Sequence, residues 1–494
     1  MTVESEAKLA APTNFELPPM EGLANGAAAM TRPRLELEAT YYDTDDLALA
    51  RWGITLRHRS GEAGPTWTVK LPQAATGRTM ARDELTFAGA ERAIPPEAAD
   101  LVRAYVRGRA LIPVARLHTS RKPIEIQKSD GTTLVEIVDD AVSVHTGRRV
   151  TRRFREVEVE AKDGAPAQAV LRSAVRRIAS AGAQDGQPMP KLVRALGARA
   201  RRPPEVVVPE LGREPRPDEL VRHAIAASVV QLLQRDALVR LGDDEEGVHK
   251  FRVATRRLRS DLGTFICLLD REQVERLRQE LRWLGREVGR VRDNEVLAEN
   301  LQRSMATLPA GDVAVAQQLI KRLRRETAQA RESMLAAMRS RRYDRLLDEL
   351  VRLAGSHRRG RRDAVDMPKL VRKRWRGLAA AVGALGDDPP DAALHNVRIK
   401  AKRCRYAAEA VVPAEGKRAA RLALAVSELQ TVLGEHQDTV VAEQWLRAAA
   451  EASPASRLVA GELVAHQRAE RARLRREWPS VWKTASSKRL RAWF

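Results

Sequence analysis

The chain has 494 residues, about three times the length of a typical domain, so two or more domains are expected. Hydrophobic residues make up 44% and aromatic residues only 4%, which favours Leu, Val and Ala helical packing, while a net charge of +22 predicts a polyanionic partner. With only two cysteines, Cys267 and Cys404, the chain cannot form a disulfide scaffold, which suggests a reducing compartment. The sequence contains no run of 18 uncharged apolar residues, so a transmembrane helix is not expected. The charged residues near the N-terminus argue against a signal peptide.

The first 200 residues contain short segments in which apolar and polar residues alternate, separated by Gly, Pro and Asp. Alternation with a period of two is typical of antiparallel strands, because successive side chains of a strand point to opposite faces of the sheet. These segments are residues 3–9, 53–59, 67–71, 134–138 and 155–160.

The charged residues of these predicted strands are sorted by face. The sets on one face are Glu4, Glu6 and Lys8; Arg57 and Arg59; Glu136 and Asp140; and Glu156, Glu158 and Glu160. Neighbouring carboxylates repel one another, and hard divalent cations such as Mg²⁺ compensate them well, while Arg and Lys bind phosphate oxygens. If these faces converge inside a closed sheet, they form a cavity that can hold and hydrolyse a polyphosphate. The alternative is an ordinary solvated outer face.

The order of these motifs resembles the CYTH domain of the triphosphate tunnel metalloenzymes over about residues 1–200. Glu4-x-Glu6-x-Lys8 is similar to the ExExK signature of that family. The other matching segments are Tyr41–Thr44, Leu56–Arg59, Trp67–Pro72, Arg82–Glu84, Arg121, Glu156–Glu160 and Lys191 with Arg194. The resemblance implies an eight-stranded antiparallel tunnel that binds a triphosphate with Mg²⁺ or Mn²⁺. Family members include inorganic triphosphatases, thiamine triphosphatases and adenylate cyclases.

Carried onto this sequence, the resemblance implies three sets of site residues. The catalytic set is Glu4, Glu6 and Lys8. The metal ligands are Glu4, Glu6, Glu136, Asp140, Glu156, Glu158 and Glu160. The triphosphate-binding residues are Lys8, Arg57, Arg59, Lys70, Arg82, Arg121, Lys191 and Arg194. The implied chemistry is metal-assisted attack of water on a terminal phosphoryl group, and Glu84 fits the pattern without an assigned role.

A proline-rich stretch at residues 202–217 separates two parts that differ in charge and in period. Residues 1–200 hold 29 basic and 25 acidic side chains, whereas residues 201–494 hold 58 and 40, so nearly all the excess charge lies in the second part. Beyond the prolines, apolar residues recur at helical spacing. We therefore predict an α+β protein with domains at 1–201 and 218–488, the first a β tunnel and the second all helical.

The helical part contains an internal repeat. His249-x-x-Arg252-x-x-x-Arg256-Arg257-x-Arg259 recurs 146 positions later as His395-x-x-Arg398-x-x-x-Lys402-Arg403-x-Arg405. A second block, Gly289–Asp293, recurs as Gly434–Asp438. Two copies of a helical half-domain, over about 218–360 and 361–488 and related by pseudo-two-fold symmetry, are predicted.

In each copy the histidine and three cations fall within about 80° of a helical wheel. These residues are His249, Arg252, Arg256 and Arg259 in the first copy and His395, Arg398, Lys402 and Arg405 in the second. A stripe of like charges destabilises an isolated helix, so its recurrence favours binding of a linear polyanion over an ordinary solvated face. Catalysis by the histidines is disfavoured, because neither has a candidate nucleophile or a metal-spaced partner nearby in the sequence.

This second part resembles the CHAD domain, the conserved-histidine α-helical domain, over about residues 218–485. The doubled histidine–arginine helix and the doubled glycine–aspartate block carry the resemblance. It implies two helical bundles around a basic surface that binds inorganic polyphosphate, with Arg286 and Arg290 added to the two stripes.

Together the motifs predict a cytoplasmic bacterial enzyme, a metal-dependent triphosphatase tethered to a polyphosphate-binding module and associated with polyphosphate granules. Tethering raises the local concentration of phosphate chains near the tunnel. A non-catalytic polyphosphate-binding protein and a CYTH-type adenylate cyclase remain open as alternatives. A nucleic-acid partner is disfavoured, since the sequence has no helix-turn-helix, zinc-ligand or aromatic-rich motif. The sequence predicts no membrane partner and no particular oligomeric state.

Overall fold

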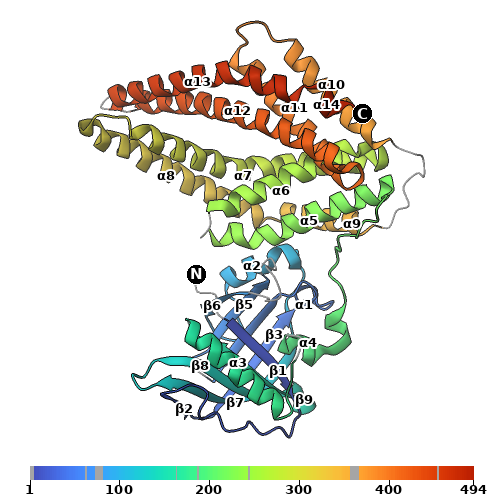
Figure 1. The fold of residues 1–494 in the computed structure, drawn as a ribbon, viewed down its shortest axis with the longest axis vertical. Coiled ribbons are helices and arrows are strands. Elements are labelled where there is room, and N and C mark those ends of the chain that lie inside the picture. The colour runs from blue at the N-terminus through green and yellow to red at the C-terminus, as the bar shows by residue number, and fades with distance from the viewer. Residues whose placement is uncertain are drawn as a thin grey trace. The chain divides into compact units, whose positions relative to one another are not determined.

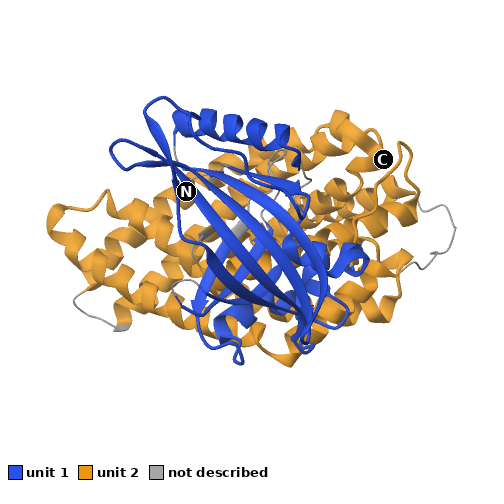
Figure 2. Ribbon diagram, turned by 90° about the horizontal axis from the view of Figure 1, so that it is seen from below, with its two compact units in different colours: residues 1–205 blue, residues 206–494 orange. Residues whose placement is uncertain are grey.

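The computed structural model describes residues 5–61, 64–72, 82–162, 164–185, 189–242, 245–356, 366–452 and 456–494. The chain forms two compact units, Met1–Glu205 (unit 1) and Val206–Phe494 (unit 2), shown in Figures 1 and 2. Unit 1 is built on an antiparallel sheet, and the described residues of unit 2 form helices and connecting loops. The predicted α+β fold class is confirmed.

Unit 1 contains one sheet with the strand order β10-β1-β9-β8-β7-β3-β4-β5-β6, in which β2 pairs with β7. Its eight longer strands are β1 (Ser5–Ala11), β3 (Leu35–Asp43), β4 (Thr55–Ser60), β5 (Thr66–Pro72), β6 (Arg82–Ala88), β7 (Ile112–Lys128), β8 (Thr133–Thr146) and β9 (Arg149–Ala161). Two short strands, β2 (Ala27–Thr31) and β10 (Gln184–Asp185), add to these. The long strands bend strongly, as Figure 2 shows.

Apolar burial sets which face of the sheet each strand residue takes. The odd-numbered Leu9, Ile137 and Val159 are at most 1% exposed and pack with Val170 and Ile178 of α3 (Ala165–Ser180). Because strand side chains alternate, the even-numbered residues of the same strands must point to the other face.

That other face is partly covered by a short helix. Leu192 of α4 (Lys191–Leu196) is 1% exposed and joins a second core with Tyr41, Leu117, Val142 and Phe154. These partners lie on the face opposite α3, so α4 holds its own charged residues over the polar side of the sheet. The remaining helices of unit 1 are α1 (Ala48–Arg51), α2 (Pro96–Val106) and the 3-10 helix Gly197–Arg201.

Unit 2 is built from long helices packed in antiparallel pairs (Figure 1). The α-helices of the described part of unit 2 are α5 (Pro217–Leu241), α6 (Glu245–Thr264), α7 (Arg271–Met305), α8 (Ala310–Met338), α9 (Arg341–Gly355), α10 (Met367–Gly383), α11 (Asp391–Ala410), α12 (Val412–Ala452), α13 (Arg457–Ala485) and the single turn α14 (Lys488–Arg491). A 3-10 turn, Ile266–Leu268, joins α6 to α7. None of the helices in the described ranges is both long enough and apolar enough to cross a lipid bilayer.

The core of unit 2 explains the orientation of the basic stripes. On α6, Phe251, Leu258 and Leu262 have no exposed surface, and they lie on the side of the helix away from the histidine–arginine stripe. A further core joins the outer ends of α7 and α8 to α12 and α13 through side chains such as Leu323 and Leu446. Burial of the apolar side of α6 therefore turns its basic side toward α11, with which it is in contact.

Candidate functional site

Strand register brings the charged residues of unit 1 onto one face of the sheet. Lys8 of β1 lies opposite Glu158 of β9, Glu156 lies opposite Asp140 of β8, and Asp140 lies opposite Arg121 of β7. The same face continues across β3 to β4, β5 and β6, where Lys70 lies opposite Glu84. Charged residues on this face include Glu6, Lys8, Arg57, Arg59, Lys70, Glu84, Arg121, Glu125, Glu136, Asp140, Arg152, Glu156, Glu158 and Glu160.

Three carboxylates of this face form a compact group, here called the acidic trio: Asp140, Glu156 and Glu158. Each offers an oxygen within 4.8 Å of the others, and Asp140 and Glu156 are 0% and 4% exposed. Burial raises the pKa of Glu156, which its cationic neighbours oppose. The pKa of Glu158 lies well below its usual value, because Lys191 and Lys8 outweigh the effect of burial.

Four cations of the chain surround the acidic trio. Lys191, the first residue of α4, places Nζ 2.6 Å from Asp140 Oδ2, 3.0 Å from Glu156 Oε1 and 3.3 Å from Glu158 Oε1. Burial would lower the pKa of Lys191, but the three carboxylates raise it far above its usual value.

The other three cations approach the trio from its sides. Arg121 donates two hydrogen bonds of 2.9 Å to Asp140, Arg194 donates one of 2.8 Å to Glu156, and Lys8 donates one of 2.9 Å to Glu158. Lys8, Arg121, Lys191 and Arg194, expected to bind phosphate, thus contact carboxylates in this structure.

A second, more cationic group lies on β4, β5 and β6. Lys70 Nζ is 2.5 Å and Arg57 Nη2 3.4 Å from the carboxylate of Glu84. Burial would raise the pKa of Glu84, but Lys70, Arg57 and Arg59 lower it. Glu84, which had no role assigned from the motifs, is therefore the counter-ion of predicted phosphate-binding cations.

Of the other predicted metal ligands, those in the described residues (Glu6, Glu136 and Glu160) pair with lysines and do not join the trio. Glu160 and Glu136 pair with Lys162, whose Nζ lies 2.6 and 3.5 Å from them, and Glu6 pairs with Lys8 at 2.7 Å. Glu4 and the side chain of Arg82 lie outside the described part of the chain.

In both repeats of unit 2 the second residue of the histidine–arginine motif lies beside the glycine of the repeated block, and the first repeat also shows the contacts that it makes there. Arg252 Nη1 lies 2.5 Å from Asp293 Oδ1 and donates a hydrogen bond of 3.2 Å to the Gly289 carbonyl. A Cβ added at Gly289 would lie 3.8 Å from Arg252, and one at Gly434 would lie 3.5 Å from Arg398. Each glycine thus lies against the guanidinium group of its own repeat, at a distance where an added Cβ would make an ordinary van der Waals contact.

Cations from both repeats meet between α6 and α11. Burial, followed by Arg398, Arg256 and Arg252, lowers the pKa of Lys402 to about 6. Burial and the same two arginines of α6 also lower the pKa of Arg398, against the opposing effect of Asp438. We call Arg252, Arg256, Arg398 and Lys402 the central cations.

The two histidines share this environment. Burial and neighbouring arginines lower the pKa of both: Arg292, Arg256 and Arg252 act on His249, and Arg398 with Lys402 acts on His395. His249 also lines a pocket of about 620 Å³ bounded by α5, α6 and the end of α11.

Three other predicted polyphosphate-binding residues have their own partners or are exposed. Arg405 donates to Ser427 at 3.0 Å and lies 3.5 Å from Glu409. Arg286 and Arg290 are exposed on α7, and Arg290 lies 3.5 Å from Glu287.

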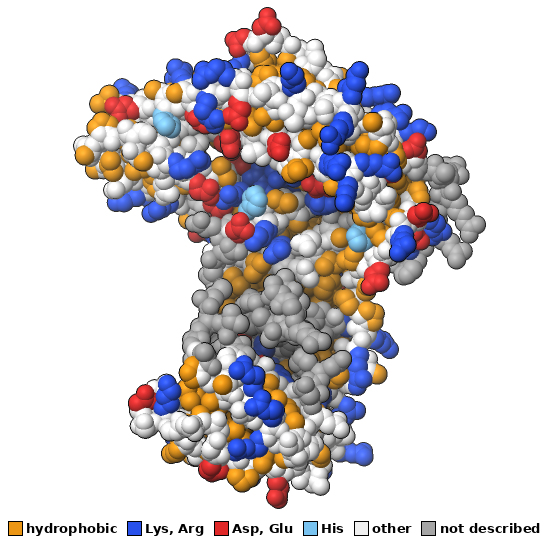
Figure 3. Space-filling view, viewed as in Figure 1, with side chains coloured by type: hydrophobic (Ala, Val, Ile, Leu, Met, Phe, Trp, Pro, Cys, Tyr) orange, Lys and Arg blue, Asp and Glu red, His pale blue; other side chains and the backbone are white. Residues whose placement is uncertain are grey.

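Sequence reasoning missed an arginine group around Arg259. The pKa of Arg259 is lowered mainly by burial and, to a smaller extent, by the positive charges of Arg282, Arg278 and Arg403. An arginine recurs every four residues along α7, at Arg278, Arg282, Arg286 and Arg290, which predicts that these side chains share one face of the helix. This spacing could have identified the group from the sequence. Figure 3 shows Lys and Arg side chains spread widely over unit 2.

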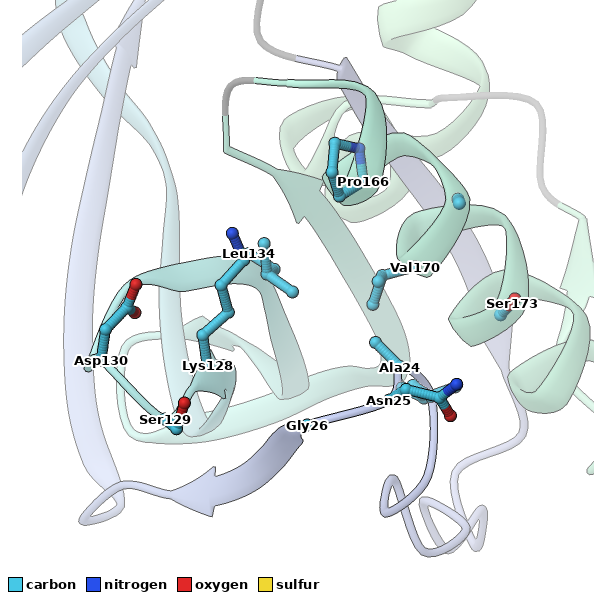
Figure 4. A pocket seen from close by; sticks show the side chains of 12 residues that line it. Ala24, Asn25, Gly26, Lys128, Ser129, Asp130, Leu134, Pro166, Val170 and Ser173 are labelled. Atoms are coloured by element: carbon cyan, nitrogen blue, oxygen red, sulfur yellow. The ribbon is translucent and has the colours of Figure 1, made fainter.

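A pocket of about 510 Å³ in unit 1 is separate from the acidic trio. It lies between the turn at Lys128–Asp130 and α3, with Leu134 and Val170 in its wall (Figure 4). None of the predicted site residues that the structure describes lines it, and its wall combines apolar side chains with the polar Asn25, Lys128 and Asp130.

Comparison with known proteins assigns both units. The CYTH domain family matches residues 3–191, and the CHAD domain family matches residues 223–447. Two relatives, uncharacterized proteins of Mycobacterium tuberculosis strains CDC 1551 and H37Rv, are each 33% identical over 452 residues, covering 87% of this chain and 85% of theirs.

Two solved structures are also similar. PptA from Streptomyces chartreusis matches 54% of this chain and 98% of its own with 26% identity and a TM-score of 0.47. The CHAD domain from the plant Ricinus communis matches 57% of this chain and 96% of its own with 22% identity and a TM-score of 0.47. On the family matches, which fall on unit 1 and unit 2 in that order, the chain belongs to the proteins in which a CYTH domain is followed by a CHAD domain.

Proposed function

We propose that unit 1 hydrolyses a triphosphate with the help of Mg²⁺ or Mn²⁺ and that unit 2 binds inorganic polyphosphate. The observation that carries the first part is the acidic trio, which shares one face of the sheet with the cations Arg57, Arg59 and Lys70. A face with carboxylates at one side and cations at the other is suited to a metal-bound phosphate chain.

The acidic trio fits a hard divalent cation. Mg²⁺ and Mn²⁺ prefer carboxylate oxygens, and the three oxygens lie close enough to share one ion. A bound ion would neutralise charge on the transferred phosphoryl group and lower the pKa of a coordinated water.

The residues of the chain would position the substrate by exchanging counter-ions. Arg57 and Lys70, which pair with Glu84 in this structure, would bind phosphate oxygens instead. They would thereby hold the substrate's phosphate chain in line with the acidic trio. Glu6, paired with Lys8 near one edge of the trio, would orient a water or a metal-bound ligand there.

In unit 2 the central cations support polyphosphate binding. They come from two helices of different repeats, so a linear polyanion lying between α6 and α11 would meet both copies of the motif. Grouping these four basic side chains costs free energy in the free protein, as the lowered pKa values of Lys402 and Arg398 show, and a phosphate chain relieves that cost. Such binding would associate the enzyme with polyphosphate granules.

One experiment tests both parts. Purified full-length protein is assayed for phosphate release from inorganic triphosphate, thiamine triphosphate, ATP and long-chain polyphosphate, with and without Mg²⁺ or Mn²⁺, and for retention on immobilised polyphosphate. We expect metal-dependent release from a triphosphate. Glu158→Gln should lower it at least a hundredfold and leave retention unchanged, since loss of one transition-state contact typically costs about 10²–10³ in rate.

Reciprocal and matched variants separate the two functions. Arg256→Gln with Arg398→Gln should abolish retention and leave triphosphate hydrolysis intact. Glu38→Gln, on the opposite face of β3 from the trio, should change neither. Unchanged turnover by Glu158→Gln would contradict the metal assignment, and formation of cyclic AMP from ATP in place of phosphate release would make unit 1 a cyclase.

A further inference from the structure

Lys191 occupies the middle of the acidic trio. Its ammonium contacts all three carboxylates, at 2.6, 3.0 and 3.3 Å, whereas Arg121, Arg194 and Lys8 reach the group from its sides. An ion held by these oxygens of Asp140, Glu156 and Glu158 would therefore lie against the Lys191 nitrogen.

A divalent cation and this ammonium cannot hold that position together. Metal–oxygen distances are about 2.0–2.1 Å for Mg²⁺, so an ion bound to two of these oxygens would lie between them and against Nζ. Two positive charges in contact inside a partly buried site repel strongly. Metal binding to the trio thus requires the Lys191 side chain to leave.

The local structure allows that movement without unfolding the helix. Lys191 is the first residue of α4, while the next residue, Leu192, is 1% exposed and fixed in the core. The backbone can stay in place while the flexible lysine stem rotates. A displaced ammonium that remains partly buried needs a new anion, and a phosphate group bound beside the trio supplies one.

We propose that Lys191 is a resident counter-ion of the acidic trio, which the divalent cation displaces and which then pairs with the bound phosphate chain. This inference rests on the proposed function of unit 1. Its consequence is coupling: triphosphate gives the displaced lysine a partner and so favours metal binding, and metal binding frees a cation for triphosphate. Lys191 is thus a positioning residue that sets how the two ligands depend on each other.

Mn²⁺ binding to the full-length protein without any phosphate tests the displacement. The concentration of free Mn²⁺ is followed by electron paramagnetic resonance during titration of wild type, Lys191→Met, Lys191→Arg and Lys162→Met. Lys191→Met should bind Mn²⁺ on the order of tenfold more tightly than wild type, because no internal cation competes. Lys191→Arg keeps a cation and should bind no more tightly than wild type.

Lys162→Met is the matched control, because Lys162 pairs with Glu160 and Glu136 on the same sheet face but not with the trio. It should bind Mn²⁺ as wild type does. Equal Mn²⁺ affinity of wild type and Lys191→Met, in a wild type that hydrolyses triphosphate, would overturn this inference alone. Absence of both Mn²⁺ binding and hydrolysis in wild type would overturn the proposed function and this inference with it.

A second measurement uses the unaltered protein, should Lys191→Met fail to fold. The rate at which an amine-acetylating reagent modifies Lys191 is measured by mass spectrometry with and without Mn²⁺, and Lys162 serves as the internal reference. Release from the three carboxylates should increase the rate at Lys191 severalfold and leave Lys162 unchanged. An unchanged or slower rate at Lys191 under saturating Mn²⁺ would refute the displacement.

Discussion

Lys402 should make polyphosphate binding by unit 2 depend on pH. Its ammonium faces Arg398 of its own helix, Arg252 and Arg256 of α6 and the opposing charge of Asp438 on α12. Burial and the three arginines lower its pKa to about 6, against about 10.4 for a lysine in water. Near pH 7.5 the free protein therefore holds this side chain mostly neutral.

A bound phosphate chain counteracts the positive charges that lower the pKa of Lys402. It brings negative charge beside the central cations and raises the pKa of Lys402, so binding above pH 6 takes up a proton. For one proton the affinity falls at most about tenfold per pH unit, and we expect a total decrease of about tenfold from pH 6.5 to 8.5 because the pKa recovers only in part. In the free protein both histidines have lowered pKa values, so they are largely neutral in this range before the phosphate chain binds.

Stability should show the opposite trend. Because the pKa of Lys402 is lower in the folded than in the unfolded state, the unfolded state binds more protons between about pH 6 and pH 10. The contribution of Lys402 therefore makes the free energy of unfolding of unit 2 rise with pH in that window, while polyphosphate affinity falls.

Fluorescence anisotropy with labelled long-chain polyphosphate measures the affinity at pH 6.5, 7.5 and 8.5 and constant ionic strength. Lys402→Met should bind weakly with little pH dependence, and Lys402→Arg should bind tightly with little pH dependence. Lys400→Met, about 200° around the same helix, should behave as wild type. A wild-type affinity that does not change with pH, or a slope that persists in Lys402→Met, would refute the reasoning.

Two further predictions concern stability, measured as the urea midpoint of the unit that carries each change. Gly61→Ala should destabilise unit 1 by about 2 kcal/mol or more, since Gly61 has a φ of +106° and an added Cβ would lie 2.1 Å from the Glu36 carbonyl oxygen. Gly131→Ala is the matched control: Gly131 has a φ of +82° but open space around it, so the substitution should cost about 1 kcal/mol. Equal costs for the two variants would contradict the steric reasoning. Asp236→Asn should destabilise unit 2 by about 3–5 kcal/mol, because the fully buried carboxylate accepts hydrogen bonds from Arg240 at 2.6 Å and from Tyr343 at 2.7 Å; a cost below about 1 kcal/mol would show that this pair contributes little.

Sequence parity was sufficient to predict which residues of unit 1 share a face. Alternation follows directly from strand geometry, so Glu156 and Glu158 had to point the same way once Val157 and Val159 were buried. The contacts between strands and α4 could not be predicted in the same way. Lys191 is distant in sequence from Asp140, and its position beside the acidic trio depends on how Leu192 packs in the core.

In unit 2 the repeated stripe was readable from helical spacing, but the partners of individual residues were not. Arg405 belongs to the stripe by angle, yet it pairs with Ser427 of α12, a residue that no motif links to it. Arg374 of α10 donates to the Gly263 carbonyl across the repeat boundary and has no counterpart in the repeated motifs. Contacts between helices of different repeats depend on packing, which helical periodicity alone does not specify.

The environments of Lys191 in unit 1 and Lys402 in unit 2 shift the pKa of the lysine in opposite directions. In unit 1 Lys191 is half-buried against three carboxylates that raise its pKa, so it stays charged, and in our proposal it leaves when another cation takes its place. In unit 2 Lys402 is half-buried among like charges that lower its pKa, so it is mostly neutral in the free protein. The first arrangement favours exchange of one cation for another and suits a site that needs a metal. The second favours uptake of a proton together with an anion and suits a surface that binds phosphate chains without a metal.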